Sequence, residues 1–273
     1  VGLSNGAVKL LKGWQVDKKI DGEESQAWKL EQICDVKSQQ ADKNLHKLAA
    51  SSLATHPNAE LALSVGEDGA IYELQAEPSG QVKANPWNQN ADWVALYDIK
   101  FSSTGHSFFT AGASGGVRMW DSSSRGFKTL NEGGSGAGYL SIEPVETHVL
   151  AATEAGAIHI FDIRYEKGAI YMHESDTLED GFHSASVWAI RRCGGNERTF
   201  LSCSADGTVL SFVPQLHNRA HIIPFRWHRY SQGVNDVHAV LCDAGQRSET
   251  ILTMAAADSG LLFASSADSD PGL

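Results

Sequence analysis

The side chains that could do chemistry in this sequence are serines, histidines and acidic residues. A serine nucleophile needs a histidine base within hydrogen-bond reach, and the base needs a carboxylate to orient it. The chain of 273 residues holds 11 histidines and 33 acidic residues, but we expect no nucleophile elbow of the G-x-S-x-G type. We therefore predict no catalytic residue and no enzyme, although the sequence leaves open a Ser-His-Asp triad assembled in space.

Two further patterns could hold a metal ion or a phosphate group. His217 and His221 stand at i,i+4 spacing, but zinc takes three or four ligands and no Cys or His partner follows at motif distance. Residues 133–138 are rich in glycine, but no Lys-Ser/Thr follows and residues 139–142 predict a strand, whereas a phosphate loop precedes a helix. We expect a solvated loop and a flexible connection, with no metal and no cofactor.

A basic and aromatic segment offers binding rather than catalysis. Residues 217–230 include Arg226 and Trp227, and Arg, Trp and Tyr are the commonest anchors of protein interfaces. The alternative is a variable outer loop whose aromatic side chains pack against their own fold. Arg226 and Trp227 are candidate partner-binding residues.

Composition limits the classes of partner. The formal net charge of -11 disfavours direct binding to nucleic acid or to an anionic membrane. The longest apolar runs fall far short of the roughly 20 residues that cross a bilayer, so we expect no membrane insertion. The four cysteines are scattered without a C-x-x-C pair, which favours reduced thiols and a reducing compartment.

One short pattern recurs along the whole chain, namely a turn with Gly, Asn or Asp, then a small residue, then alternating apolar positions. The copies lie at residues 4–8, 67–71, 114–117, 154–158, 205–209 and 258–261, and their turn residues include Gly6, Asp68, Gly69, Gly115, Gly156, Asp206 and Gly207. Asn-Gly and Asp-Gly suit tight hairpins in which both central residues take positive φ. We interpret the aspartates as structural, since capping the turn's own amides explains them.

Each turn joins a strand of small residues to a strand with a bulky end. The small-residue strands are expected at 61–65, 108–111, 149–152, 199–203 and 251–254, and the bulky ends at Leu74, Trp120, Phe161, Phe212 and Phe263. Further inner strands are expected at 97–101, 187–190 and 234–237, and outer strands in variable segments such as 27–30 and 168–171. Tyr97 and Trp188 begin inner strands, so we predict that they line one face and contact partners.

Trp120-Asp121 and Phe161-Asp162 match the dipeptide that names the WD repeat. We therefore predict an all-β WD40 β-propeller and treat residues 1–273 as a single domain. Its approximate repeats are a remnant at 1–16 and five full repeats at 17–76, 77–121, 122–163, 164–213 and 214–273. A β-sandwich is the alternative, but it predicts no fixed order of turn, small residue and aromatic.

The sequence resembles a WD40 nucleoporin family, of about forty-three kilodaltons, from the Y-shaped outer-ring complex of the nuclear pore. The resemblance rests on residues 64–69, on 187–190 leading to 200–207, and on 231–237 after a long insertion. The chain departs from the repeat pattern where Ser211-Phe212-Val213 replaces Trp-Asp. That family is seven-bladed, which implies that this N-terminally incomplete sequence, which begins with Val1, lacks the first blade and most of the second.

The resemblance implies a scaffold bound to α-helical nucleoporins of the Y-complex short arm. The location would be the nucleus, at the nuclear pore in the nuclear envelope, with an association with kinetochores in mitosis. The alternative is a substrate receptor of a cullin-type ubiquitin ligase, because Asp162-Ile163-Arg164 resembles the W-D-x-R ending by which some propellers bind the ligase adaptor. Arg164 is therefore a further candidate for partner binding.

Overall fold

The computed structural model describes residues 2–20, 23–36, 44–77, 81–132, 136–165, 171–173, 183–192, 200–216, 221–229, 234–243, 249–257 and 262–267. Every regular element in these ranges is a β-strand, which confirms the predicted all-β class. No helix in the described ranges has the length and hydropathy to cross a bilayer. The chain divides into two compact units, Val1–Ile99 and Lys100–Leu273, with the boundary inside strand β7.

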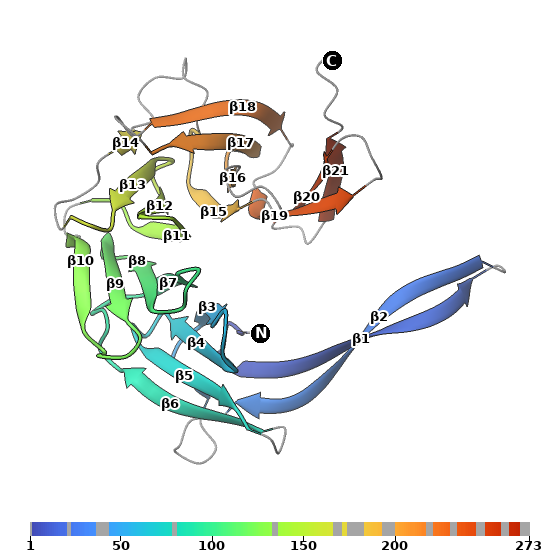
Figure 1. Cartoon of the computed structure of the whole chain (residues 1–273), viewed down its shortest axis with the longest axis horizontal. Coiled ribbons are helices and arrows are strands. Elements are labelled where there is room, and N and C mark those ends of the chain that lie inside the picture. The colour runs from blue at the N-terminus through green and yellow to red at the C-terminus, as the bar shows by residue number, and fades with distance from the viewer. Residues whose placement is uncertain are drawn as a thin grey trace. The chain divides into compact units, whose positions relative to one another are not determined.

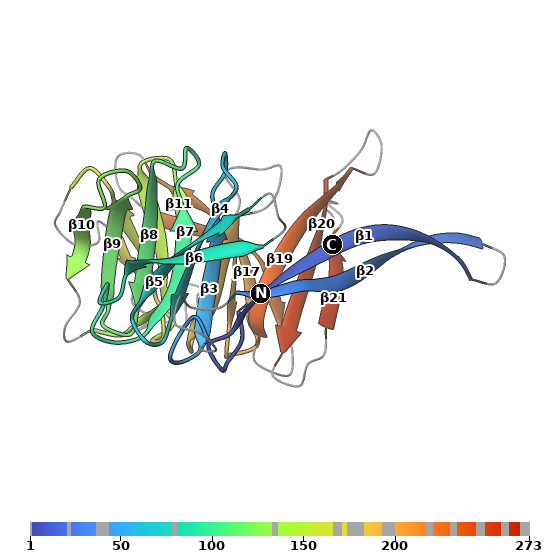
Figure 2. The same ribbon diagram turned by 90° about the horizontal axis from the view of Figure 1, so that it is seen from below.

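The first unit contains a two-stranded and a four-stranded antiparallel sheet (Figure 1). The two-stranded sheet consists of β1 (Val8–Ile20) and β2 (Glu23–Val36), and the four-stranded sheet of β3 (Ala50–Thr55), β4 (Leu61–Gly66), β5 (Ile71–Ala76) and β6 (Val82–Asn88). Val8 and Val36 pack in one cluster with Leu45, Leu74 and Ala84, so the base of the long ribbon is anchored on the sheet. The rest of the ribbon extends beyond that sheet in both views (Figure 2).

The second unit repeats the same antiparallel sheet. The strands are β7 (Leu96–Phe101), which spans the boundary, β8 (Ser107–Gly112), β9 (Gly116–Asp121) and β10 (Phe127–Glu132); β11 (Tyr139–Val145), β12 (His148–Thr153), β13 (Ile158–Asp162) and β14 (Tyr171–His173); β15 (Val187–Arg192), β16 (Phe200–Ser204), β17 (Thr208–Gln215) and β18 (His221–Arg229); and β19 (Val234–Asp243), β20 (Glu249–Ala257) and β21 (Leu262–Ala267). Neighbours in each sheet are neighbours in sequence, as short hairpin connections require.

The predicted strands match these elements, apart from residues outside the described ranges. The small-residue segments form β4, β8, β12, β16 and β20, and residues 27–30 lie in β2. The predicted outer strand at 168–171 enters the described ranges only at Tyr171, the first residue of β14. The outer strand of each four-stranded sheet pairs with the strand immediately before it in the sequence. These sheets span residues 50–88, 96–132, 139–173 and 187–229.

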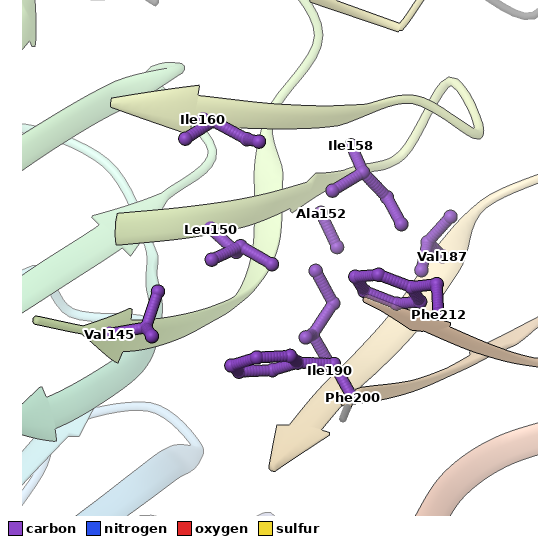
Figure 3. Packing of buried hydrophobic residues seen from close by; sticks show 9 residues of the cluster. All are labelled: Val145, Leu150, Ala152, Ile158, Ile160, Val187, Ile190, Phe200 and Phe212. Atoms are coloured by element: carbon purple, nitrogen blue, oxygen red, sulfur yellow. The ribbon is translucent and has the colours of Figure 1, made fainter. Parts of the chain in front are cut away.

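Packing between adjacent sheets explains the small residues. Every residue of β12 and of β16 is buried, because a second strand has a neighbouring sheet against its face. Figure 3 shows one such interface, where Leu150 and Ile160 of one sheet meet Ile190, Phe200 and Phe212 of the next. Small and aliphatic side chains are needed there because interiors are packed to the density of organic crystals.

The hairpin turns differ from the predicted geometry. Gly69 has φ +71° and Gly207 has φ +80°, but Asp68 and Asp206 are not among the residues with positive φ. The amide of Gly69 donates to the Gly66 carbonyl at 3.0 Å, and Gly207 and Ser204 are paired in the same way at 3.1 Å. Each turn is therefore closed by an i to i+3 hydrogen bond, and only its glycine has a left-handed φ. The prediction of two positive φ values was wrong.

Candidate protein-binding surface

One histidine connects a loop, a strand and a turn of the β3–β6 sheet through its two ring nitrogens. His46, in the loop before β3, contacts the Asp68 carboxylate through Nδ1 at 2.9 Å and the Ser64 hydroxyl through Nε2 at 2.8 Å. Asp68 also accepts hydrogen bonds from the backbone amides of Lys47 at 2.8 Å and Ala70 at 3.2 Å. The aspartate thus caps its own turn and in addition fixes the loop before the first strand.

The β15–β18 sheet repeats this cluster with an added hydroxyl. His183 contacts Ser202 through Nε2 and Thr208 through Nδ1, each at 2.7 Å. The Thr208 hydroxyl donates to Asp206 at 2.6 Å, and Asp206 also accepts from the Ser184 amide at 2.7 Å. The same loop, second strand and turn are therefore connected in both units of the chain.

These clusters hold the residues of a Ser-His-Asp triad, yet they are closed to a substrate. Ser64 and Ser202 are each 0% exposed, and His46 and His183 are 2% and 1% exposed. A nucleophile must reach a reacting atom at about 3 Å, which a fully buried hydroxyl does not. We interpret both clusters as structural.

The carboxylates of the two clusters are held in the charged form. Burial raises the pKa of Asp68, but hydrogen bonds from His46 and the Lys47 amide outweigh burial and place this pKa below its usual range. In Asp206 burial is likewise outweighed by the contacts with His183 and Thr208, and the pKa falls well below its usual range. The turns therefore depend on ionised aspartates.

A G-x-S-x-G sequence does occur at residues 112–116, contrary to the expectation from sequence. Ser114 lies in the hairpin between β8 and β9, not in a turn from a strand to a helix. Its hydroxyl accepts the Gly116 amide at 3.0 Å, and the residue is 6% exposed. Ser114 thus takes the place that Asp68 and Asp206 occupy in their turns, and the segment is no nucleophile elbow.

The turn glycines lie directly against the loop that leads into the next sheet. A Cβ on Gly69 would stand 2.3 Å from the Asp92 carbonyl oxygen, and one on Gly156 would stand 2.9 Å from the His183 carbonyl oxygen. A Cβ on Gly6 would likewise stand 2.2 Å from the His46 carbonyl oxygen. These positions need glycine for its left-handed φ and also for the space that it leaves.

In the first unit these contacts join three segments into one surface. The Glu67 amide donates to the Ala49 carbonyl at 2.9 Å, and the Asp92 amide donates to the Gly69 carbonyl at 3.2 Å. The turn 67–70 thus lies between the loops that precede β3 and β7. We call residues 44–49, 67–70 and 89–95 the turn-loop surface.

Two large apolar side chains of the turn-loop surface are exposed, and the sequence predicted neither. Trp93 is 82% exposed and Leu48 is 53% exposed. Their position in the sequence could have indicated this exposure, since each stands in a short segment just before an inner strand. Tyr97, which we did predict, lies four residues beyond Trp93 in β7 and is only partly exposed.

Trp188 owes its exposure to a β-bulge. In the β15–β16 pair the register shifts between Val187 and Ala189, so Trp188 is the extra residue of the first strand. The same shift occurs between Ala50 and Ser52 of β3 and between Tyr139 and Ser141 of β11. A bulge re-aims a side chain, and Trp188 is 41% exposed between fully buried neighbours.

Arg164 is exposed but held in place. Its Nε donates to the Asp162 carboxylate at 2.8 and 3.1 Å and its Nη2 at 2.5 Å, while 59% of its side chain stays exposed. The hydrogen bonds from Arg164 lower the pKa of Asp162 to about 2. The guanidinium also lies 5.7 Å from the ring centroid of Tyr165, which is 62% exposed.

Within the basic and aromatic segment, residues 221–229 form a strand rather than an outer loop. Arg226 and Trp227 lie in β18, paired with Ser211 and Leu210 of β17. Their side chains, with His217 and the segment 133–135, lie outside what the structure describes. In the part of the chain that it does describe, no group of three or more His, Cys, Asp or Glu side chains could hold a metal ion.

Comparison with known proteins defines the class. Residues 86–121, which include β7–β9, match the family model described as WD domain, G-beta repeat. The WD40 β-propeller domain of Doa1 has a TM-score of 0.58 at 15% identity, with 80% of this chain and 64% of that chain covered. A chain of the mitotic checkpoint complex has a TM-score of 0.64 at 12% identity, with 98% of this chain and 70% of that chain covered. No curated protein sequence matches the chain.

The chain therefore contains a WD40 repeat and has the WD40 β-propeller fold. It spans less than two thirds of the Doa1 domain's chain. The identities of 15% and 12% relate these proteins by fold alone. Because WD40 propellers generally present loops to other proteins, the class indicates a protein-interaction scaffold.

Proposed function

We propose that this chain is a protein-binding scaffold of the nuclear pore outer ring, held by the α-helical nucleoporins of the Y-complex short arm. In that position it supports the transport of RNA and protein through the pore. The choice of this assembly rests on the sequence resemblance at residues 64–69, 187–190, 200–207 and 231–237. The proposed location is the nuclear pore in the nuclear envelope, with kinetochores as a second location in mitosis.

The observation that carries the scaffold role is the combination of fixed loops and exposed anchors. Loops that are already ordered lose little conformational entropy when a partner binds. His46 and Asp68 fix the loop before β3, and Trp93 stands 82% exposed in the adjoining loop. A stable interface takes roughly 800 Å² from each partner, and few side chains carry most of the energy.

Charge supports a protein partner over the other classes. The chain has 33 acidic and 22 basic residues, for a formal net charge of -11. Such a field repels nucleic acid and anionic lipid. We therefore propose that neither is bound directly and that any role in RNA transport belongs to the assembly.

Affinity purification of the full-length protein from its own cells, under mild conditions, tests the assembly. Helical nucleoporins of the outer ring are expected at one copy per copy of this protein. Their absence, under conditions in which other outer-ring subunits co-purify with one another, would contradict the proposal.

A receptor of a cullin-type ubiquitin ligase is the second candidate, supported by Arg164. Its guanidinium is preorganised by Asp162 and stays 59% exposed, as an interface anchor needs. Arg164→Ala should then abolish binding of the ligase adaptor, measured by co-purification. Retention of the adaptor by Arg164→Ala, or recovery of no adaptor with the unmodified protein, rejects this candidate.

A further inference from the structure

We propose that Asn5 is a site of spontaneous deamidation and that the two products of this reaction act differently on the fold. Aspartate at this position keeps the turn of residues 3–7, whereas isoaspartate separates that turn from the loop before β3. The inference goes beyond the proposed function and is independent of it, because it concerns a covalent modification within the first unit.

The Asn5-Gly6 peptide combines the residue types that favour this reaction. It is the single place in the sequence where glycine follows asparagine. Glycine has no side chain to hinder attack by its own amide nitrogen. Asn5 is also exposed, so water and hydroxide reach its side chain.

The reaction needs only water and hydroxide. The amide nitrogen of Gly6 loses its proton to hydroxide and attacks Cγ of Asn5, so that a new N–Cγ bond forms. The bond between Cγ and Nδ2 of Asn5 breaks, and the nitrogen leaves as ammonia with a proton taken from water. Water then opens the cyclic imide at one of its two carbonyl groups, which gives either aspartate or isoaspartate.

Two hydrogen bonds of the turn act on this reaction in opposite directions. The Ala7 amide donates to Oδ1 of Asn5 at 3.1 Å. This oxygen becomes negatively charged when Cγ is attacked, so the donor stabilises the intermediate. The Gly6 amide donates to the Leu3 carbonyl at 3.0 Å, which opposes the loss of its proton. We therefore expect Asn5 to react in the folded protein, but more slowly than in the unfolded chain.

Aspartate already occupies the equivalent position in two other turns. Asp68 and Asp206 each accept the backbone amide two residues later, at 3.2 and 2.8 Å, as Asn5 does at 3.1 Å. The glycines that follow Asn5, Asp68 and Asp206 have φ of +81°, +71° and +80°. The aspartate product can therefore cap the turn in the same way.

Isoaspartate does not fit, because it adds a carbon atom to the main chain inside a closed turn. The Leu3 amide donates to the Ala7 carbonyl at 2.9 Å across this turn. The turn has no space on the side of the loop, since a Cβ on Gly6 would stand 2.2 Å from the His46 carbonyl oxygen and 2.4 Å from that of Leu48. The longer chain must therefore move away from the loop before β3.

That movement breaks hydrogen bonds that hold the loop. The His46 amide donates to the Gly6 carbonyl at 3.0 Å, and the Ala50 amide donates to the Leu3 carbonyl at 3.0 Å. Both amides become open to exchange with water when the turn leaves. Because residues 44–49 belong to the turn-loop surface, isoaspartate at position 5 alters that surface as well.

The test is incubation of the purified full-length protein at mildly alkaline pH, in buffer and in urea. Peptide mapping by mass spectrometry separates the asparagine, aspartate and isoaspartate forms. Asn58 is the matched internal control, because it is exposed in the same unit but is followed by Ala59. Hydrogen exchange over residues 44–50 is measured on the separated forms and on the variants Asn5→Asp and Asn5→Gln.

Asn5 is expected to deamidate at least about tenfold faster than Asn58 in the folded protein, and faster still in urea. The isoaspartate form should lose exchange protection at the His46 and Ala50 amides. Asn5→Asp should keep this protection and the urea midpoint of the unmodified protein. Asn5→Gln should show no loss of protection that grows with incubation time, because the longer side chain forms the cyclic imide far more slowly.

Two sets of results would overturn the inference. Deamidation of Asn5 no faster than that of Asn58 would contradict the reactivity of the turn. Full exchange protection in the isoaspartate form, or equal losses of protection in that form and in Asn5→Asp, would contradict the difference between the products. None of these results depends on which proteins co-purify with the chain.

Discussion

Replacing Gly69 by alanine tests the central packing argument, because two separate effects act at this one position. Gly69 has φ +71°, a conformation that costs an L-residue roughly 1–2 kcal/mol. A Cβ there would also lie 2.3 Å from the Asp92 carbonyl oxygen and 2.9 Å from that of Val94. Both contacts are backbone atoms, so the loop before β7 must shift.

The expected loss of stability follows from these effects. Forcing a side chain into a packed site costs about 1–3 kcal/mol, and weakening the hydrogen bond from Asp92 to the Gly69 carbonyl adds about 0.5–1.5 kcal/mol. The reduced entropy of the unfolded chain returns about 0.4–1 kcal/mol. We expect Gly69→Ala to lower the free energy of unfolding by about 1.5–6 kcal/mol.

Urea unfolding followed by tryptophan fluorescence measures this change, and two further variants show its cause. Gly136→Ala is the matched control, since a Cβ at Gly136 meets nothing within 4 Å, and it should stay within about 0.5 kcal/mol of the unmodified protein. Asparagine tolerates a left-handed φ but carries a Cβ, as alanine does. The Gly69→Asn protein should therefore also be less stable than the unmodified protein. A Gly69→Asn protein as stable as the original, or a Gly69→Ala protein within the range of the control, would refute the reasoning.

Three other outcomes are expected, each measured by urea or thermal unfolding. His46→Ala should cost about 2–4 kcal/mol, because it leaves the buried Ser64 hydroxyl and Asp68 without their shared partner; a change as small as that of an exposed substitution would contradict the role of the cluster. Trp120→Phe should cost about 1 kcal/mol, because it removes the 2.9 Å hydrogen bond from the indole to Thr110 while the packing is largely kept; Thr110→Val in the same background should then add little. The pKa values of Asp68 and Asp206 lie below their usual 3.8 in the folded state. The stability that the two carboxylates contribute is therefore present above pH 3.8 and is lost as the pH falls towards the folded pKa values. Asp68→Asn and Asp206→Asn should flatten the acid side of the profile of stability against pH, and an unchanged acid side would reject this account.

The sequence by itself determined the secondary structure and the class of fold. Gly6, Gly69, Gly115, Gly156 and Gly207 mark hairpins because left-handed φ is a local requirement that glycine meets. The alternation of small and bulky apolar residues places β4, β8, β12 and β16 because strand periodicity is also local. The order of these signals was enough to predict a WD40 β-propeller.

Only the tertiary structure decided what the turns and loops do. His46 lies 18 residues from Ser64 and 22 from Asp68, so no local pattern joins them. The exposure of Trp93 depends on the contact of its loop with Gly69, and the exposure of Trp188 depends on a bulge in pairing with β16. Local sequence determines where glycine permits a left-handed φ and where strand periodicity occurs, whereas burial, bulges and the joining of loops depend on which distant segments pack together.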